Sequence, residues 1–355
     1  MNYEQELFEL LETVARQNAS DLHLSAGRIP TLRIDGSLVP IKKGRILTPE
    51  DTEGFTDILL NDQQKESLQR NKAVDLSYAY KNIARFRINV YYQFNTISIA
   101  LRFIPAKIRT LGELGLPETL HRFTRYQQGL VLITGPAGHG KSTTLAAIID
   151  EVNNSRTDHI ITIEDPIEYI FTQNRSIIDQ REVGRDTVSF RAALRDSFRQ
   201  DPDVIMLGEM RDPETISTAI TAAETGHLIF GTLHTNNASQ TIDRIIDSFA
   251  PEQQSQIRAQ LALTLVGVIS QRLLPRIDGG RMPALELLLA NSAVRNLIRE
   301  NKVHEIGLVI ETSADQGMIS MNRYFADLVK RGEISAEVAE NYSLNPTEFR
   351  MLIEK

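Results

Sequence analysis

Cysteine is absent from this sequence, and its absence excludes several kinds of chemistry. A chain without thiols has no disulfide bond, thiolate zinc site, iron–sulfur cluster or cysteine nucleophile. The lack of cysteine is consistent with a reducing cytosolic compartment. No apolar run approaches the roughly 20 residues that a membrane-spanning helix needs. Low-complexity tracts and short-period repeats are missing as well. If the protein works at a membrane, we therefore expect it to act at the surface without inserting.

An excess of positive charge is also lacking. The 355 residues include 39 basic and 46 acidic side chains, which gives a net charge of -7. A nucleic-acid motor would usually show a basic groove, so this balance disfavours one. Hydrophobic residues make up 41% and charged residues 24% of the chain, which is ordinary for a soluble globular protein. At this length the chain is expected to form two or three domains.

The first part of the chain predicts a small α+β domain over residues 1–103. Its start, MNYEQELFELLETVARQ, has the pattern of an acidic amphipathic helix and not that of a signal peptide. The stretches ASDLHLS, PTLRIDG and LVPI alternate apolar and polar residues and predict strands. Residues 49–68 then predict a helix, with Thr48 as its cap.

A longer alternation over residues 84–105 predicts a β-hairpin that turns near Asn95. Apolar side chains would lie on one face, and Arg85, Arg87 and Arg102 on the other. Taken alone, this pattern favours a half-buried sheet whose polar face is simply solvated. Residues 104–118 break the periodicity with Pro and Gly, and we place a linker there.

The rest of the chain predicts an α/β domain over residues 119–291. The stretches GLVLIT, HIITIED, DVIMLGE and HLIFGTLH are short, continuous apolar runs separated by segments of helical length. This sequence pattern is typical of buried parallel strands with crossover helices, so a mostly parallel sheet is expected. From about Ser292 onward the pattern is helical, which predicts a C-terminal helical subdomain over residues 292–355.

Residues 135–142, GPAGHGKS, match the phosphate-loop pattern G-x-x-x-x-G-K-[ST] in full. The expected strand Leu130–Thr134 precedes the loop and the expected helix Ser142–Val152 follows it, which is the context that the motif requires. Converging backbone N–H groups and the helix N-terminus bind phosphate, while a lysine reaches the β- and γ-phosphates and a serine hydroxyl binds Mg²⁺. The residues predicted to contact the nucleotide are Gly135, Pro136, Ala137, Gly138, His139, Gly140, Lys141, Ser142 and Thr143. The motif alone does not choose between a kinase, a GTPase, an ATPase motor and a transporter subunit.

Carboxylates follow two of the expected strands. ITIEDPIEY supplies Glu164 and Glu168, and DPDVIMLGEMRD supplies Glu209 after the strand Val204–Leu207. Ligand-binding and catalytic residues of a parallel sheet commonly lie at such strand ends. We therefore interpret Glu209 as the residue that holds the metal's water shell, and one of Glu164 and Glu168 as functional. Asp212, before Pro213, instead predicts the start of a helix.

Two histidines, His227 and His234, lie at the two ends of another expected strand. Because no third ligand is evident nearby, the pair does not indicate a metal site. The pattern alone favours buried structural histidines. The functional interpretation is a role in sensing phosphate or in linking subunits.

Several separate stretches carry a family resemblance that covers nearly the whole chain. ASDLHLSAGRIPTLRIDG looks like a PAS-like domain, RFRINVYYQ and LRFIP like arginine-bearing strands, and GPAGHGKST like a Walker A loop. TIEDPIE looks like an aspartate box, DPDVIMLGEMRD like an atypical Walker B segment, and TGHLIFGTLHT like a histidine box. AVRNLIRE is close to the motif AIRNLIRE. The chain resembles the secretion-superfamily hexameric ATPases and, among them, the type IV pilus retraction ATPases of the PilT family.

The resemblance implies roles for particular residues. Glu209 would be the Walker B carboxylate, holding Mg²⁺ through water together with the Ser142 hydroxyl, and Glu164 and Glu168 would both be candidates for the water-activating base. His227 and His234 would link the nucleotide state to the subunit junction. Arg87 and Arg102, with Arg85 as a further candidate, would reach the γ-phosphate of a neighbouring subunit, which reverses the solvated interpretation of the hairpin face. The stretch that would matter for retraction is Ala293, Val294, Arg295, Asn296, Leu297, Ile298, Arg299 and Glu300. Its pattern by itself predicts an amphipathic helix, with Val294, Leu297 and Ile298 on one face and Arg295 and Arg299 on the other.

The implied fold is a RecA-like P-loop ATPase core, preceded by the PAS-like domain and followed by the helical segment. The implied function is an ATP-hydrolysing homohexameric motor that powers pilus retraction and twitching motility. It would use ATP and Mg²⁺ and act on an inner-membrane platform protein from the cytoplasmic face. A paralogous retraction ATPase is a further candidate partner. Neither nucleic-acid binding nor membrane insertion is expected.

The sequence departs from the family pattern in two places. The loop reads PAGHG where the family usually has PTGSG, so Ala137 lacks a hydroxyl and His139 adds a titratable ring. We expect binding to survive this change, with a different rate or affinity. The stretch SADQGMISMNRYFADLV is divergent in its early part, but it lies outside the expected nucleotide site.

Four rival functions remain open from the sequence. The nearest is a pilus-assembly or type II secretion ATPase, but those enzymes usually carry a four-cysteine zinc insertion and an extra N-terminal domain, and this chain is expected to have neither. An accessory retraction ATPase, paralogous to the main motor, is the second. The third is a nucleotide-binding ring adaptor without turnover, against which Glu209 and the intact aspartate box argue. The fourth is a RecA-like nucleic-acid translocase, against which the acidic balance and the lack of interleaved aromatic and basic residues argue.

Overall fold

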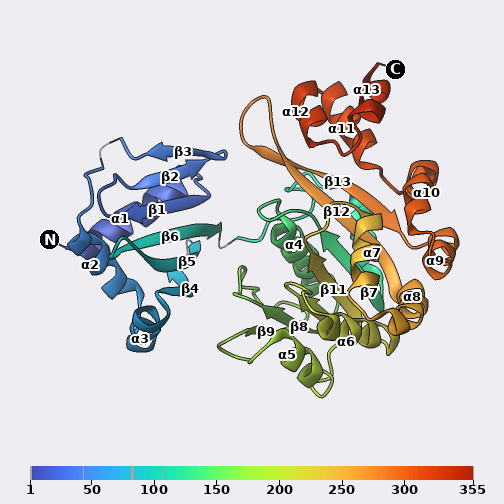
Figure 1. Ribbon diagram of the computed structural model, residues 1–355, viewed down its shortest axis with the longest axis horizontal. Helices are drawn as coiled ribbons and strands as arrows, with labels where there is room; N and C mark the ends of the chain where they lie inside the picture. Colours follow the sequence, from blue (N-terminus) through green and yellow to red (C-terminus); the bar gives the residue numbers. More distant parts are fainter. Residues whose placement is uncertain (1, 43, 81–83, 106, 355) are drawn as a thin grey trace. The chain divides into compact units, whose positions relative to one another are not determined.

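The computed structural model describes residues 2–42, 44–80, 84–105 and 107–354 (Figure 1). The chain divides into two compact units. Unit 1 comprises Met1–Lys107 with Pro166–Ile170, and unit 2 comprises Ile108–Asp165 with Phe171–Lys355. The finer four-part division predicted above, with its linker at residues 104–118, stays a prediction.

Unit 1 is built on a six-stranded sheet in the order β3-β2-β1-β6-β5-β4, and all of its strand pairs are antiparallel. Helices α1 and α2 pack against β6, and α3 packs against β4. The buried core between them includes Leu11, Phe55, Phe86 and Leu101. The elements are α1 (Tyr3–Arg16), β1 (Asp21–Ser25), β2 (Thr31–Ile34), β3 (Ser37–Pro40), α2 (Pro49–Leu59), α3 (Asp62–Asn71), β4 (Ala73–Tyr80), β5 (Ala84–Gln93) and β6 (Thr96–Pro105).

The predicted hairpin and its two faces are confirmed. β5 and β6 pair in register across a turn at Phe94 and Asn95, both of which have positive φ. The predicted single helix over residues 49–68 is wrong, because it is two helices. Thr48 caps α2 as expected, but Asn61 and Gln64 form a second capping box that starts α3. An asparagine cap satisfies free backbone N–H groups, so it favours a new helix start over a continuous helix.

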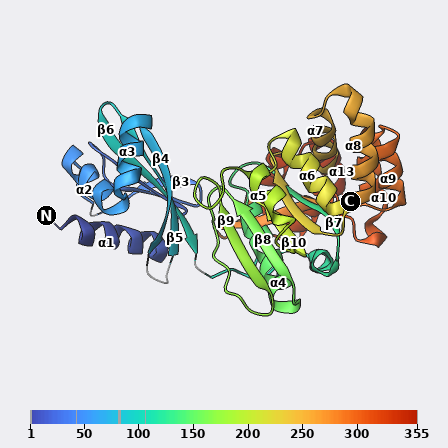
Figure 2. The same ribbon diagram turned by 90° about the horizontal axis from the view of Figure 1, so that it is seen from below.

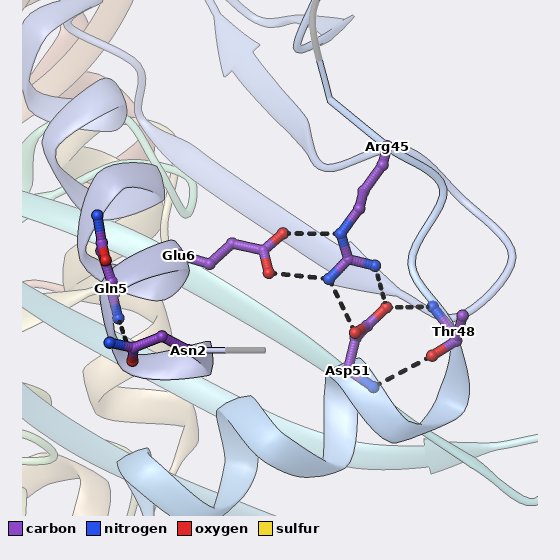
Figure 3. A network of polar contacts seen from close by, with 6 residues as sticks. All are labelled: Asn2, Gln5, Glu6, Arg45, Thr48 and Asp51. Carbon is purple, nitrogen blue, oxygen red and sulfur yellow. Dashed lines mark hydrogen bonds and ion pairs between the residues drawn. The ribbon is translucent and has the colours of Figure 1, made fainter.

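A cluster of charged residues, Glu6, Arg45 and Asp51, links the start of α1 to the start of α2 in unit 1 (Figure 3). The guanidinium of Arg45 donates from Nη2 to Glu6 Oε2 at 2.8 Å and to Asp51 Oδ1 at 2.8 Å. Asp51 Oδ2 also accepts from the backbone N–H of Thr48 at 2.7 Å. The hydrogen bond from Arg45 is the main cause that lowers the pKa of Asp51 to about 2, although burial opposes it. Asp51 therefore stays ionised at neutral pH, and its charge favours the N-terminus of α2.

Unit 2 is built on a seven-stranded sheet in the order β13-β12-β7-β11-β10-β8-β9. All neighbours are parallel except β12 and β13, which are antiparallel. The mostly parallel α/β fold is thus confirmed. Its sheet strands are β7 (Gly129–Thr134), β8 (His159–Glu164), β9 (Ile177–Glu182), β10 (Val204–Leu207), β11 (Leu228–Leu233), β12 (Leu265–Pro275) and β13 (Arg281–Leu289).

Helices cover both faces of this sheet (Figure 2). The connection from β7 to β8 runs through α4 towards the β9 edge, whereas the connection from β10 to β11 runs through α6 in the opposite direction. Because such crossovers are right-handed, helices of opposite direction lie on opposite faces. The helices up to β12 are η1 (Glu118–Arg125), α4 (Lys141–Ser155), α5 (Phe190–Ser197), α6 (Pro213–Glu224), α7 (Ala238–Asp247) and α8 (Pro251–Thr264).

The C-terminal part is helical, as predicted from Ser292 onward. Helix α9 packs against α8, while α11 packs on β13 and α12 packs on β12. These elements are α9 (Ser292–Arg299), η2 (Val303–Glu305), α10 (Ile306–Thr312), η3 (Ala314–Gln316), α11 (Met321–Lys330), α12 (Ala336–Tyr342) and α13 (Pro346–Ile353). Among the helices of the described residues, none has the length and apolar character to cross a membrane.

Candidate nucleotide site

The register of the parallel strands brings the phosphate loop, His234 and Glu209 to one sheet edge. Thr134, at the end of β7, pairs with Leu233, at the end of β11, so Gly135 and His234 leave neighbouring strands side by side. Leu207 of β10 pairs with Ile163 of β8, which places Gly208 and Glu209 next to the end of β8. The carboxyl ends of such strands are where open α/β sheets bind ligands.

The phosphate loop is pressed against β12. Gly135 has a φ of 140°, and a Cβ atom there would lie 2.3 Å from the backbone oxygen of Gln271. Gly140 has a φ of 79°, and a Cβ atom there would lie 2.9 Å from Gln271 Nε2. At Gly135 the positive φ and the contact with a backbone atom both exclude a side chain, while at Gly140 the positive φ is what favours glycine. Gln271 also accepts a hydrogen bond from Thr144 Oγ1 at 2.7 Å, so β12 supports the loop and the first turn of α4.

Lys141 is buried, and its ammonium group lies inside the loop. Nζ donates to the backbone oxygens of Gly135 at 2.7 Å and Pro136 at 2.9 Å. It also lies 3.2 Å from His234 Nδ1. Because an ammonium group can only donate, this nitrogen of His234 accepts, and the ring carries its proton on Nε2.

His234 connects the phosphate loop to the acidic strand end. Its Nε2 lies 3.2 Å from Glu209 Oε1, and Glu209 Oε2 lies 2.7 Å from Arg211 Nη2. Burial alone would raise the pKa of Glu209, but the hydrogen bond and charge of Arg211, together with His234, outweigh it and lower that pKa. Lys141, His234 and Glu209 therefore form one continuous polar chain with an ionised carboxylate at its end.

The two candidates for the water-activating base lie in different units. Glu164 ends β8 in unit 2, is buried, and accepts from Thr162 Oγ1 at 2.7 Å and Gln180 Nε2 at 3.4 Å. Glu168 belongs to the Pro166–Ile170 segment of unit 1. Two hydrogen bonds hold the Glu164 carboxylate at the same sheet edge as Glu209. Which of the two glutamates activates the water stays a prediction.

The residues at this edge fit a magnesium ion bound with a nucleotide. Ser142 is exposed in the first turn of α4, next to Lys141. Within the described residues, no group of three or more His, Cys, Asp or Glu side chains could hold a metal by itself. Mg²⁺ commonly keeps several waters and takes only one or two protein oxygens besides phosphate, so a hydroxyl and a water-bridged Glu209 suit it.

The predicted arginines lie in unit 1, on the polar face of its sheet. Arg87 and Arg102 are register partners on β5 and β6. Arg102 Nε donates to Asp21 Oδ1 at 3.0 Å, while Arg85 Nε donates to Ser77 Oγ at 2.5 Å. The side chain of Arg102 is 57% exposed, so this ion pair does not bury it. The inter-subunit role of these arginines stays a proposal.

His227 does not reach the phosphate loop within this chain. It precedes β11, at the opposite end of the strand from His234. Its Nδ1 lies 3.0 Å from the backbone oxygen of Ala222, and its ring packs against Phe198 with centroids 5.7 Å apart. These contacts suit a structural histidine. A role of His227 at a subunit junction stays a prediction.

The AVRNLIRE stretch forms α9, with Val294 and Ile298 buried as its amphipathic pattern predicts. Arg295 differs from the simple polar face that we expected. Its guanidinium donates to backbone oxygens of α8, β12 and the residue after β13. Arg299 is exposed and donates to Asn296 Oδ1 at 2.7 Å. The two arginines of this motif thus have different surroundings.

Sequence reasoning missed a second layer of polar residues behind the site. Arg272 Nη2 donates to Asn236 Oδ1 at 3.0 Å, and Glu286 Oε1 accepts from the backbone N–H of Ala238 at 2.8 Å. Asn236 and Ala238 both lie shortly after His234, at the start of α7. A polar pair, Gln271 with Arg272, inside the apolar run LTLVGVISQRLLP could have signalled this layer, because buried polar groups need partners.

The Glu286→Gln protein is expected to lose a pH dependence of folding stability. Burial raises the pKa of Glu286 to about 7 from 4.5, although the Ala238 N–H and Arg272 oppose it. The folded state therefore holds an extra proton between these values, so the free energy of unfolding falls as pH rises from about 4.5 to 7 and is level above that. Urea unfolding at pH 5 and at pH 8 measures how far the free energy of unfolding falls between the two pH values. This fall should be smaller by roughly 1–3 kcal/mol in Glu286→Gln than in the unmodified protein. An equal fall in both proteins would contradict this prediction. Glu252→Gln, at an exposed residue, is the control and should show the same fall as the unmodified protein.

Comparison with known proteins agrees with this geometry. The model of the family "Type II/IV secretion system protein" matches residues 3–305. The chain is 44% identical over 344 residues to the type IV pilus retraction ATPase PilT of Pseudomonas aeruginosa, which covers 97% of this chain and 100% of that protein. It is 40% identical over 350 residues to the type IV pilus ATPase PilU of the same organism, covering 98% and 91%.

A solved structure is similar over the same extent. The crystal structure of the pilus retraction motor PilT with bound ADP matches with a TM-score of 0.87 and 46% identity, covering 97% of this chain and 98% of that one. The family match extends through both units and includes the phosphate loop, Glu209 and His234. The chain therefore belongs to the type II/IV secretion system protein family and, within it, to the PilT family.

Proposed function

We propose that this chain is an ATP-hydrolysing motor that powers the retraction of a type IV pilus. The observation that supports it most is the polar chain Lys141–His234–Glu209, which joins the phosphate loop to the acidic end of β10. A nucleotide-binding fold without turnover would need no such link between a phosphate-binding lysine and a carboxylate. The relatives are named as a pilus retraction ATPase and as the pilus retraction motor with bound ADP, which supports retraction as the process that ATP hydrolysis drives.

The residues divide the chemistry among them. Bound ATP with Mg²⁺ would supply the γ-phosphoryl group that is transferred to water. The loop N–H groups and Lys141 hold the negative charge of the phosphates. Glu164, fixed by Thr162 and Gln180, orients the attacking water and accepts its proton at a carboxylate oxygen. His234 responds to the nucleotide, because Lys141 Nζ cannot keep both its present loop contacts and a full set of phosphate contacts.

The motor acts as a homohexameric ring at the cytoplasmic face of the inner membrane. Arg87 and Arg102 of one subunit complete the site of its neighbour by stabilising charge in the transition state. A change in nucleotide state alters the arrangement of the subunits, and the ring transmits it to a membrane platform protein. The contact with the platform would be made at the membrane surface.

A complementation experiment tests the cellular function. The chain is expressed in Pseudomonas aeruginosa lacking its own PilT, and twitching zones are measured. We expect zones to recover to at least about half of the normal diameter, because the relatedness spans the whole of that protein. The purified protein should also hydrolyse ATP with a specific activity that rises with protein concentration as rings assemble.

The accessory role is the second candidate, because the PilU relative matches almost as well. The same chain is therefore expressed in a strain lacking PilU only. Recovery there without recovery in the strain lacking PilT would assign the accessory role. ATP binding without hydrolysis at any protein concentration would instead favour the ring adaptor and overturn the motor.

A further inference from the structure

His139 is the residue of the phosphate loop that β12 holds both by its side chain and by its main chain. Its ring nitrogen Nδ1 accepts a hydrogen bond from the backbone N–H of Leu273 at 3.0 Å. Its backbone oxygen accepts another from Gln271 Nε2 at 2.8 Å. Both donors belong to β12, so the position of this residue follows the position of the strand.

The ring of His139 also faces the C-terminal helices. Tyr342, the last residue of α12, packs against it with ring centroids 6.2 Å apart and an interplanar angle of 55°. Aromatic pairs attract each other at such distances in tilted arrangements. Helix α12 also packs along β12. The C-terminal helices thus contact the phosphate loop through an aromatic pair.

The ring of His139 is held in one form. Since the N–H of Leu273 donates to Nδ1, this nitrogen is unprotonated and the neutral ring carries its proton on Nε2. The ring of Tyr342 from α12 packs against it, and the charges close enough to act on it are those of Arg272 from β12, Lys141 from α4 and Arg281 from β13. Burial above all, and then the three cations, lower the pKa of His139. A neutral acceptor is what the bond to Leu273 requires.

The two residues before His139 could not make this set of contacts. Ala137 has no polar side chain, and Gly138 has none at all. A serine at position 139 would be too short to reach a partner on α12 and has no ring to pack there. The contact therefore depends on an imidazole at this position and on the tyrosine that faces it.

We propose that His139 is a positioning residue through which Tyr342 and the C-terminal helices set the conformation of the phosphate loop for nucleotide binding. The proposal rests on the proposed nucleotide-binding function. Fixing the loop before the phosphates arrive removes part of the cost of ordering it, so losing the contact weakens binding. Tyr342 would then affect nucleotide affinity without touching the nucleotide.

Binding of a fluorescent ADP analogue to the full-length protein tests this. Both His139→Ser and Tyr342→Ala should raise its Kd about three- to tenfold, the size expected from one aromatic contact. The double variant should bind no more weakly than the weaker-binding of the two single variants, since both changes break the same contact. In hydrolysis assays KM for ATP should rise by a similar factor, with a smaller change in kcat.

Conservative variants separate positioning from a folding defect. Tyr342→Phe keeps the ring and should recover most of the affinity lost in Tyr342→Ala. His139→Asn offers an oxygen to the N–H of Leu273 and should lie between His139→Ser and the unmodified protein. Leu344→Ala, at an exposed residue just after α12, is the matched control and should bind normally.

The outcomes distinguish this proposal from the function on which it rests. If the unmodified protein fails to bind the ADP analogue, the nucleotide-binding function itself is wrong. If it binds and Tyr342→Ala binds equally well, or if the two single effects add in the double variant, the contact does not position the loop and the proposal is overturned.

Discussion

The purified Lys141→Ala protein is expected to hydrolyse ATP at least about a hundredfold more slowly than the unmodified protein, the usual scale for losing one group that stabilises transition-state charge. Lys141 is the buried cation of the phosphate loop, and it contacts both Gly135 and His234. Its loss removes a phosphate contact and also cuts the polar chain to Glu209. The measurement is the steady-state release of phosphate at saturating ATP, at a protein concentration that supports assembly.

Two controls make this result specific. Lys302→Ala removes an exposed lysine that pairs with Glu300, and it should leave the rate unchanged. Circular dichroism should show that Lys141→Ala remains folded. A Lys141→Ala rate above about a tenth of normal would mean that this lysine does not carry the phosphate charge, and the site assignment would have to move away from the loop.

The same variant tests whether the site is shared between subunits. Arg102→Ala should also be inactive, while Arg33→Ala should stay active, although Arg33 lies beside the same Asp21 at 3.9 Å. When Lys141→Ala and Arg102→Ala proteins are mixed, some turnover should return, because a junction can combine an intact Lys141 with an intact Arg102. No recovery, with mixed rings shown to form, would contradict an arginine supplied by a neighbour.

Local signals in the sequence were enough for elements that start and stop at distinctive residues. Thr48 and Asp212 predicted helix starts, and both cap their helices in the structure. The apolar run Val204–Leu207 predicted β10 with its observed bounds. In each case a cap or a change of hydrophobicity lies within a few residues, so the signal is local.

Two of the strands that escaped prediction, β9 and β12, lack such local signals. Helix α8 ends at Thr264 and β12 begins at Leu265, inside one apolar run without Gly or Pro at the boundary. Strand β9, IIDQRE at the edge of the sheet, has a single buried residue, Ile178, among exposed and half-buried ones, so it has no buried run to detect. Their places follow from pairing with distant strands, which periodicity does not record.

The site was predictable in its parts but not in its connections. The loop pattern identified Lys141, and a strand end identified Glu209. That His234 Nδ1 and Nε2 would join them depends on the register of β7, β11 and β10. Tyr342 lies about 200 residues beyond His139 in the chain, and no motif marks it. Contacts of that kind arise only from the packing of the C-terminal helices.

The Arg295→Ala protein is expected to be less stable by about 2–4 kcal/mol, which is large for one side chain. The guanidinium donates to the backbone oxygens of Ala262 at 2.5 Å and Leu263 at 2.6 Å, where α8 ends. It also donates to those of Leu265 at 2.9 Å and Ala290 at 3.0 Å. The last carbonyls of a helix have no intrahelical partner, so alanine would leave the part-buried oxygen of Ala262 unsatisfied, while the exposed oxygen of Leu263 can turn to water.

Thermal and urea unfolding measure this effect. The melting temperature should fall by roughly 4–15 °C for a domain of this size. Arg295→Lys keeps the charge but not the planar fork that serves several carbonyls at once, so an intermediate loss is expected. Arg299→Ala, on the same helix and exposed, is the matched control and should change stability by less than about 0.5 kcal/mol.

The outcome decides how the AVRNLIRE motif can be interpreted in cells. If Arg295→Ala unfolds at a lower temperature while Arg299→Ala stays stable, a retraction defect in Arg295→Ala is explained by the loss of folding stability. Only Arg299→Ala then tests the exposed side of the helix. Arg299→Ala should then hydrolyse ATP normally, and a loss of twitching in that variant would assign the exposed side to the transmission of work. If Arg295→Ala melts like the unmodified protein, its carbonyl contacts do not stabilise the end of α8, and both arginines are available for a partner.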